Sequence, residues 1–391
     1  IYFSAVGPFL TFTLLLKGID ALAILLVLGM SMLISIGFSM LGLLIATLSD
    51  SKGLQVFFSV VIIAALLFAT FMSIMMASVL LMQPVPVREP EFWTAIATCL
   101  TVYATYFMVA FQVASARLTF ESDNRSTKVR VSIGIQFLLC LGWITYWWFR
   151  ERGGGLLLIW VTIPVAIHWF VVGSFLIAES SGLSQRVARQ VPRQALGRAL
   201  TALLFPGPAT GLAYLFMNLV CLVTMVGFGE LTAGWLWPST MPVVRVGGEN
   251  PTLFVLAMAS YVFVYCGLGA MLIRTLRRRW SLPAIGGATL TWLLAALGSV
   301  VPNFFALVLP GHQFQDYRIW QISDPIATLA ELYQSPDSHG LALIPAALAL
   351  LVLLLSLRAM GGAVREIITA ARQPITGRRI VDGQKSNSVA A

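Results

Sequence analysis

The sequence predicts an all-α protein, a polytopic bundle of transmembrane helices, and two observations carry this prediction. Hydrophobic residues make up 58% of the 391 residues and charged residues only 10%, whereas soluble domains carry about 25% charged residues. Residues 21–48 and residues 54–82 contain no charged side chain. Because about 20 helical residues cross a hydrocarbon core of about 30 Å, each run is long enough to span a bilayer.

These two runs are predicted to form a helical hairpin. The break between them reads SDSKG over residues 49–53, which is too short for a domain and suits a tight turn. Further charge-free runs follow along the chain, mostly separated by short connections that are polar or rich in Pro and Gly. The nine candidate spans are 21–48, 54–82, 92–116, 131–149, 155–178, 209–229, 252–273, 284–309 and 340–357.

The Lys and Arg residues predict the orientation of the spans. Of the 25 in the chain, 19 lie in the turns after the first, third, fifth and seventh spans or in the C-terminal tail. Short basic loops stay on the cytoplasmic side of a membrane. We therefore expect a multi-pass protein of the cytoplasmic (inner) membrane with its C-terminus in the cytoplasm. Nucleic-acid binding is not expected, because no basic soluble module with interleaved aromatic residues is present.

This topology predicts two related halves. Residues 1–116 hold the last three spans of a first half, residues 117–130 form a cytoplasmic connector, and residues 131–359 hold a complete second half of six spans. Residues 360–391 form a basic cytoplasmic tail that is expected to be flexible. The first residue would lie outside, and the chain begins Ile-Tyr-Phe without Met. We therefore expect the sequence to start partway through a longer protein.

Few residues inside the predicted spans could do chemistry. His168 is the one titratable side chain well inside a predicted helix, and a packing role is favoured over a proton relay. In the predicted outer segment 310–340 a solvated loop is favoured over a metal site, because the spacing of its possible ligands matches no motif. Those possible ligands are His312, Asp316, Asp324, Asp337 and His339.

Three serines, Ser31, Ser35 and Ser39, lie four residues apart and so share one helix face. Small residues at this spacing allow membrane helices to pack closely, and a stripe that lines a transport path is the alternative. The chain has no Gly-x-x-x-x-Gly-Lys-Ser/Thr loop for ATP and no recognisable protease or hydrolase motif. It is therefore not expected to be an enzyme or to bind a cofactor itself.

A basic amphipathic segment reads LSQRVARQVPRQALGRAL over residues 183–200. Such a segment can lie on an anionic membrane surface or dock a partner protein, and both interpretations stay open. Pro192 predicts that the segment forms two short helical pieces rather than one helix.

The pattern resembles the membrane subunit of a type-2 ATP-binding-cassette (ABC) exporter. The resemblance rests on the sequence LLIATLSDSK over residues 43–52 followed by an apolar helix, on six-span units with both ends inside, and on the basic segment 181–198 between the second and third helices of the later half. It covers residues 10–116 best and the remainder by topology only. It implies a separate ATPase subunit that binds ATP and magnesium, a lipid-like or amphipathic substrate, and either a homodimer or a pseudo-dimer within one chain.

The resemblance also implies which residues contact the ATPase. Arg186, Arg189, Arg193 and Arg198 are the first choice, and Asp50, Lys52, Arg277, Arg278 and Arg279 are the second. Two other functions stay open. The chain could be a membrane scaffold or sensor that transports nothing, or a secondary carrier, which the scarcity of ionisable groups in the spans disfavours.

Overall fold

The computed structural model confirms the all-α prediction, because the residues that it describes form helices and no strand. The described residues are 2–18, 20–48, 52–82, 85–120, 123–152, 155–180, 191–192, 194–237, 250–308 and 317–370.

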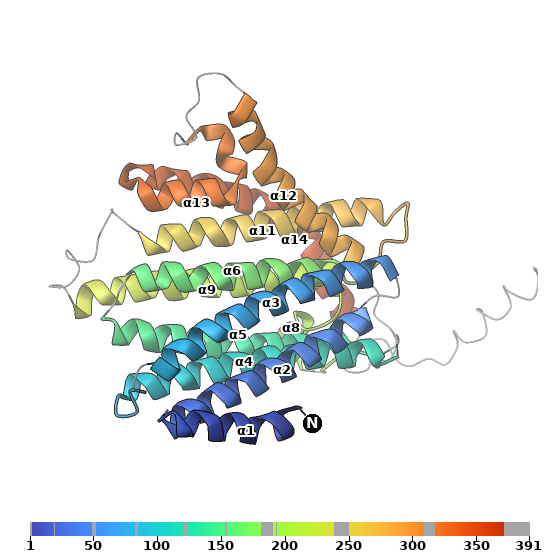
Figure 1. The fold of residues 1–391 in the computed structure, drawn as a ribbon. Coiled ribbons are helices and arrows are strands. Elements are labelled where there is room, and N and C mark those ends of the chain that lie inside the picture. The colour runs from blue at the N-terminus through green and yellow to red at the C-terminus, as the bar shows by residue number, and fades with distance from the viewer. Residues whose placement is uncertain are drawn as a thin grey trace, which may run out of the picture. The chain divides into compact units, whose positions relative to one another are not determined.

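The helices follow one another along the whole described chain (Figure 1). The α-helices are α1 (Tyr2–Leu16), α2 (Ala21–Leu48), α3 (Lys52–Met82), α4 (Pro90–Leu118), α5 (Ser126–Arg150), α6 (Gly155–Ile177), α8 (Ala195–Ala202), α9 (Pro208–Leu236), α11 (Pro251–Leu276), α12 (Ala284–Val308), α13 (Pro325–Gln334) and α14 (Leu343–Ala370). Two 3₁₀ helices, η1 (Ile319–Ser323) and η2 (Pro336–Ala342), flank α13.

Each of the nine predicted spans corresponds to one long helix, and the multi-pass membrane character of the chain is thereby supported. Within the described residues, eight helices are long and apolar enough to cross a membrane, and α3 is a further apolar helix of 31 residues. Two differences from the prediction stand out. Helix α1 was not expected, and α14 continues to Ala370, so residues 360–370 are helical rather than part of a flexible tail.

Proline marks where several of these helices begin. Pro90, Pro208, Pro251 and Pro325 each occupy the first helical position, where the absent N–H is not needed and the fixed φ angle suits the helix. At α13 the preceding Asp324 completes the start, because its carboxylate accepts a hydrogen bond from the Ile326 N–H at 3.0 Å.

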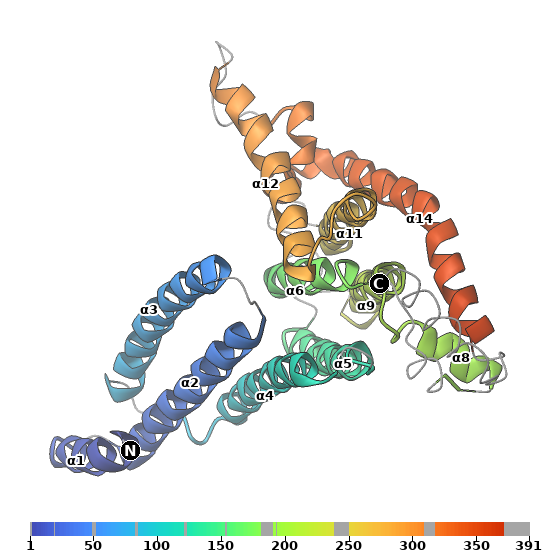
Figure 2. The same ribbon diagram turned by 90° about the vertical axis from the view of Figure 1, so that its right-hand side faces the viewer.

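The chain forms two compact units. Unit 1 comprises residues 1–121, 125–164 and 224–252, and unit 2 comprises residues 122–124, 165–223 and 253–391. In unit 1, α4 runs alongside α5 and also contacts α2 (Figure 2). The Trp147 indole donates to the Thr98 hydroxyl at 3.0 Å, and the Tyr103 hydroxyl donates to the Leu33 carbonyl at 2.6 Å.

Aromatic residues gather where α5 and α9 end in unit 1. The ring of Trp237 lies 5.7 Å from that of Trp148 and 5.8 Å from that of Phe149, in edge-to-face arrangements. In the same unit Arg150, at the end of α5, forms an ion pair with Glu91 in the first turn of α4. Such an aromatic and charged rim is typical of the level of the lipid headgroups.

Unit 2 contains the best-packed part of the molecule, with α11 at its centre. Over the apolar stretch of α11, 83% of the residues are buried, compared with none over that of α4 in unit 1. Trp169, Leu215 and Cys266 are fully buried. Close approach of α6 and α9 requires a glycine, because a Cβ at Gly211 would lie 2.5 Å from the Leu176 carbonyl oxygen. These helices therefore form a rigid core on which the ends of unit 2 are built.

Candidate functional site

Several helix ends of unit 2 meet around the Arg277 side chain. Its guanidinium donates to the carbonyls of Ala178 and Glu179, just past the end of α6, the second of these at 2.6 Å. It also donates to the Leu282 carbonyl at 3.4 Å, before the start of α12. A cation is favoured at this position, because the carbonyls at the C-terminal end of a helix carry partial negative charge.

Glu179 extends this set of contacts to α9. Its carboxylate accepts a hydrogen bond from the Gly207 N–H at 3.1 Å, directly before the first residue of α9. Gly207 has a φ angle of +141°, which glycine adopts without strain. Burial lowers the pKa of Arg277 from its ordinary value, but a guanidinium stays protonated at neutral pH. The contacts therefore join α6, α9, α11 and the start of α12.

The short helix α8 lies against the last turns of α14 (Figure 2). Val191, Ala202 and Phe205 are buried together with Ile367 of α14, and Val364 packs against them. We use the term "basic end" for the part of unit 2 formed by α8, the ends of α6, α11 and α14, and the starts of α9 and α12. Because α6, α11 and α14 end here while α9 and α12 start here, these successive long helices alternate in direction.

The basic end contains four of the residues that the sequence associates with an ATPase. Arg198 is half-buried in α8, and Arg277 is bound to the end of α6. Arg278 and Arg279 are exposed just after α11. Lys52 is exposed at the start of α3 and belongs to unit 1. The remaining residues, Asp50, Arg186, Arg189 and Arg193, lie outside the described part of the chain.

The serine face of α2 stays a prediction. Ser31 is half-buried, while Ser35 and Ser39 are exposed, and the hydroxyls of Ser31 and Ser39 donate to carbonyls of their own helix at 2.8 and 2.9 Å. The close contact of α2 with α4 instead uses Gly37, where a Cβ would lie 3.2 Å from the Tyr103 ring.

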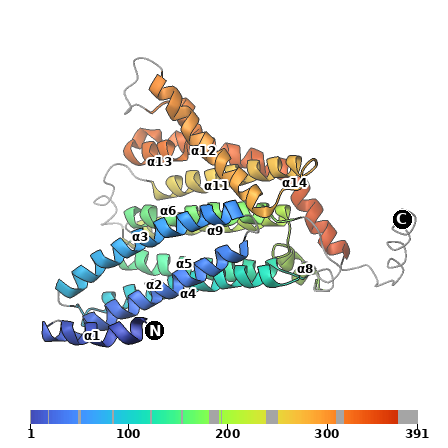
Figure 3. The ribbon, with the colours of Figure 1, turned by 45° about the vertical axis from the view of Figure 1, so that its right-hand side comes forward.

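The largest departure from the sequence-based prediction lies between α12 and α14. The predicted loop covers residues 310–340, of which residues 310–316, with His312 and Asp316, lie outside the described part of the chain. Residues 317–342 do not form a solvated loop but fold into η1, α13 and η2. Helix α13 runs alongside α11, which is visible in Figures 1 and 3. Leu332 of α13 and Ala342 of η2 are buried together with Ala257 of α11. The chain therefore returns along α11 before α14 begins.

The turn between η1 and α13 reaches about halfway along α11. The hydroxyls of Tyr261 and Tyr265 donate to the carbonyls of Ile322 and Ser323. Tyr265 follows Pro251 by 14 residues, which is about 21 Å along a helix that rises about 1.5 Å per residue. Since α11 has 26 residues, this turn lies near the middle of a membrane-crossing helix. We refer to residues 317–342 as the re-entrant segment.

A buried carboxylate lies at this turn. Asp324 is 3% exposed, and it accepts hydrogen bonds from the Asn303 amide at 2.7 Å and from the Ile326 N–H at 3.0 Å. The Asn303 carbonyl in turn accepts from the Gln321 amide at 3.3 Å. Within the described residues Asp324 forms no ion pair. Because irregular backbone at membrane depth must find partners inside the protein, this network explains how the re-entrant segment is tolerated.

Sequence reasoning considered Asp324 only as a possible metal ligand in a solvated loop and missed its burial, although two signals were present. Asp followed by Pro, then by the apolar stretch that includes Ile326 and Leu329, is a typical start of a helix. Tyr261 and Tyr265 lie four apart and so share one face of α11. His168, which the sequence singled out, is half-buried in α6, and its ring lies 5.5 Å from that of Trp169.

No metal centre is formed by the described residues, since none of their His, Cys, Asp and Glu side chains gather in threes. No protein-family model, no curated protein and no solved structure matches the chain. The fold nevertheless defines a class, a multi-pass α-helical membrane protein. Its two polar centres are the basic end and the re-entrant segment of unit 2.

Proposed function

We propose that the chain is the membrane subunit of an ATP-driven exporter of the ABC type, powered by a separate ATPase subunit. The observation that supports this most directly is α8. It is a short helix between the second and third helices of the later half. Its last residue, Ala202, and Phe205, which follows the helix, are buried together with Ile367 near the end of α14. The resemblance expects the contact with the ATPase in this connection.

The contacts of the basic end would carry a force from α8 into the bundle. A displacement of α8 acts on α14 through Ile367 and Val364 and on α9 through the five residues that separate the two helices. Arg277 and Glu179 join α9 to α6 and α11. Closure of a nucleotide-bound ATPase would then switch the helices between inward-facing and outward-facing arrangements. The two arrangements must bind the substrate differently for transport to have a direction.

The apolar character of the spans favours a lipid-like or amphipathic substrate. Among the described residues few charged groups lie inside the spans, so a strongly charged solute would find few partners there. ATP and magnesium would be bound by the ATPase and not by this chain. A second half, either within the same chain or in a second copy, would complete the transporter.

Charge reversal in the basic segment tests the proposal. The chain is purified with its ATPase, reconstituted in vesicles and compared with the double variant Arg189→Glu plus Arg193→Glu. We expect ATP hydrolysis to persist while export falls at least about tenfold, because the ATPase no longer pushes on the bundle. Arg318→Glu, on the predicted outer side, is the control. Unchanged export by the double variant would remove the assignment of these arginines to the ATPase contact. Failure to recover any ATPase with the chain would argue for a scaffold or sensor.

A secondary carrier is the second candidate, and Asp324 is the observation that favours it. A carboxylate buried halfway along a membrane-crossing helix is a common element of proton-coupled transport. Collapse of the proton gradient in the same vesicles separates the two functions. Export that continues with ATP and without a gradient supports the ABC exporter. Export that stops without the gradient, and that Asp324→Asn also abolishes, supports the carrier.

A further inference from the structure

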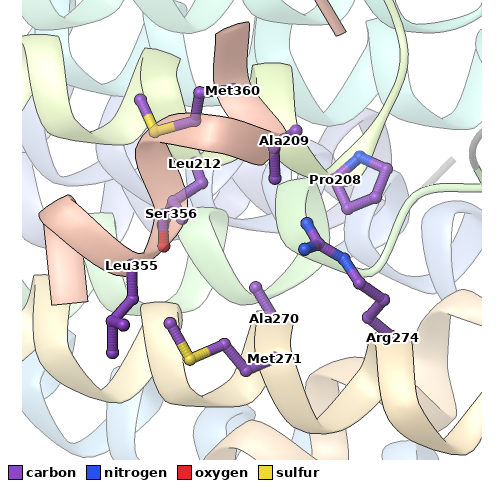
Figure 4. A pocket seen from close by; sticks show the side chains of 10 residues that line it. Pro208, Ala209, Leu212, Ala270, Met271, Arg274, Leu355, Ser356 and Met360 are labelled. Atoms are coloured by element: carbon purple, nitrogen blue, oxygen red, sulfur yellow. The ribbon is translucent and has the colours of Figure 1, made fainter. Parts of the chain in front are cut away.

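A small cavity lies between α9, α11 and α14 in unit 2 (Figure 4). Its volume is about 30 Å³, and Leu212, Met271 and Met360 are among the residues that line it. Two polar side chains, Arg274 and Ser356, also line it. Since Arg274 lies in the last turn of α11, the cavity lies close to the basic end.

Arg274 differs from Arg277, which lies three residues further along. Whereas Arg277 is bound to the carbonyls at the end of α6, Arg274 has no hydrogen bond and no ion pair within the described part of the chain. Figure 4 shows its guanidinium turned toward Pro208 and Ala209, the first residues of α9. The first N–H groups of a helix have no partner in the helix and carry partial positive charge. Arg274 and the start of α9 therefore present positive charge to the same space.

Ser356 supplies a second, independent indication. It is 6% exposed and lines the cavity from α14, yet its hydroxyl has no hydrogen-bond partner among the described residues. Other hydroxyls in helices of unit 2 donate to the carbonyl four residues earlier, as those of Ser260 and Thr291 do at 2.6 and 3.1 Å. The hydroxyl of Ser356 is thus available to a bound group in the cavity.

We propose that this cavity binds the phosphate group of an anionic phospholipid. The donors are the Arg274 guanidinium and the Ser356 hydroxyl, and the positive end of the α9 dipole adds to the charge, so that the site matches the charge and the oxygens of a phosphate. The Glu179 carboxylate already neutralises part of the positive charge at the start of α9, and Arg274 supplies the charge that an anion needs.

The surroundings of the cavity identify the source of the phosphate as a lipid. Leu355 lines the cavity and is 61% exposed, so the cavity borders an open apolar face of α14. Leu351 and Leu354 continue this exposed face by one helical turn. Acyl chains can lie along these leucines while the phosphate occupies the cavity. Basic pockets between transmembrane helices are typical sites for lipid headgroups.

Native mass spectrometry of the delipidated full chain tests the proposal with phosphatidylglycerol as the probe. We expect phosphatidylglycerol to bind more tightly than phosphatidylcholine. Arg274→Gln should weaken this binding about tenfold, since a charge-assisted hydrogen bond is lost. Ser356→Ala should weaken it by a smaller factor, and Arg274→Lys should retain most of it. Arg358→Gln is the matched control, because Arg358 is exposed on α14 but does not line the cavity.

Three results would overturn the proposal. Equal binding of the two lipids would remove the requirement for a net anionic lipid. An equal loss of lipid in Arg274→Gln and Arg358→Gln would remove the cavity as the site. Inorganic phosphate that displaces the lipid at equal concentration would identify a phosphate site without a lipid. Gel filtration of every variant shows whether it is folded. None of these results depends on whether the chain is part of an exporter.

Discussion

The two polar centres of unit 2 satisfy backbone groups in different ways. At the basic end, an arginine binds carbonyls where α6 has already ended, and neighbouring Arg278 and Arg279 are exposed. At the re-entrant segment the donors are neutral. Tyrosine hydroxyls donate to backbone carbonyls, and an asparagine amide donates to one buried carboxylate. The two centres differ because they lie at different depths in the membrane. Water can replace a lost partner at a helix end, but nothing replaces it halfway along a membrane-crossing helix. Equivalent mutations should therefore cost more at the re-entrant segment.

The largest effect is expected for Asp324→Ala. The substitution removes the N-terminal cap of α13 and one of the two acceptors of the Asn303 amide, which keeps the Ser299 carbonyl. It should lower the free energy of unfolding by about 3 kcal/mol. Titration with a denaturing detergent, followed by circular dichroism, measures this change. Asp20→Ala is the matched control, because Asp20 caps α2 through the Leu22 N–H at 3.0 Å but is exposed. An equal loss of unfolding free energy in the two variants would contradict the proposed effect of depth in the membrane.

Tyr265→Phe sharpens the comparison, because it removes one hydroxyl and little else. The Ser323 carbonyl loses its donor at the turn of the re-entrant segment, and the expected cost is about 2 kcal/mol. Hydrogen exchange at residues 322–328 should rise in this variant while exchange at the basic end stays unchanged. Tyr146→Phe is a suitable control, since Tyr146 is exposed on α5. A re-entrant segment that is protected equally in both variants would argue against the tyrosine contact.

Arg277→Gln should have a smaller effect of about 1 kcal/mol. The glutamine loses the charge at the C-terminal end of α6, but the carbonyls of Ala178 and Glu179 lie near the end of the bundle, where water can solvate them. Arg278→Gln is the control, and its effect should lie within experimental error because exposed charges contribute little. If Arg277→Gln cost more than Asp324→Ala, the comparison between the two centres would be reversed.

The sequence predicted the helices well because lipid imposes a simple requirement on them. A run without charges that is long enough to cross the bilayer must be helical, and all nine runs are. The last span was predicted to end at residue 357, directly before Arg358. A helix satisfies its own backbone in water as well, so α14 continues to Ala370.

The candidate site could be predicted only in part. Arg277 was selected for its charge, and it does bind the end of another helix. Asp324 was placed in a solvated loop, because the spacing of the possible ligands in segment 310–340 matches no metal-binding motif. Its burial depends on Asn303, Tyr261 and Tyr265, which lie on two other helices. The sequence around Asp324 does not indicate these contacts, because the partner residues are far away in the chain. The cytoplasmic orientation of the basic end stays a prediction.

The smallest expected effect is a dependence of stability on pH that arises at Tyr317. Burial raises the pKa of the Tyr317 phenol, the nearby carboxylates of Glu331 and Asp324 raise it further, and the hydrogen bond with Thr328 opposes both. The folded protein therefore favours the protonated phenol. Its contribution to stability should be complete below pH about 10, the ordinary pKa of tyrosine, and should decline as the pH rises through the higher pKa of the folded state.

Tyr317→Phe isolates this contribution. Unfolding measured between pH 9 and pH 11 should show a loss of stability in the unmodified chain that is less steep in the variant. Tyr146→Phe, in unit 1, controls for the tyrosines of the rest of the chain. Equal slopes in the unmodified chain and in Tyr317→Phe would mean that the phenol is as well solvated when folded as when unfolded. The re-entrant segment would then be open to water at Tyr317, and the contrast with the basic end would be confined to Asp324 and the two tyrosines of α11.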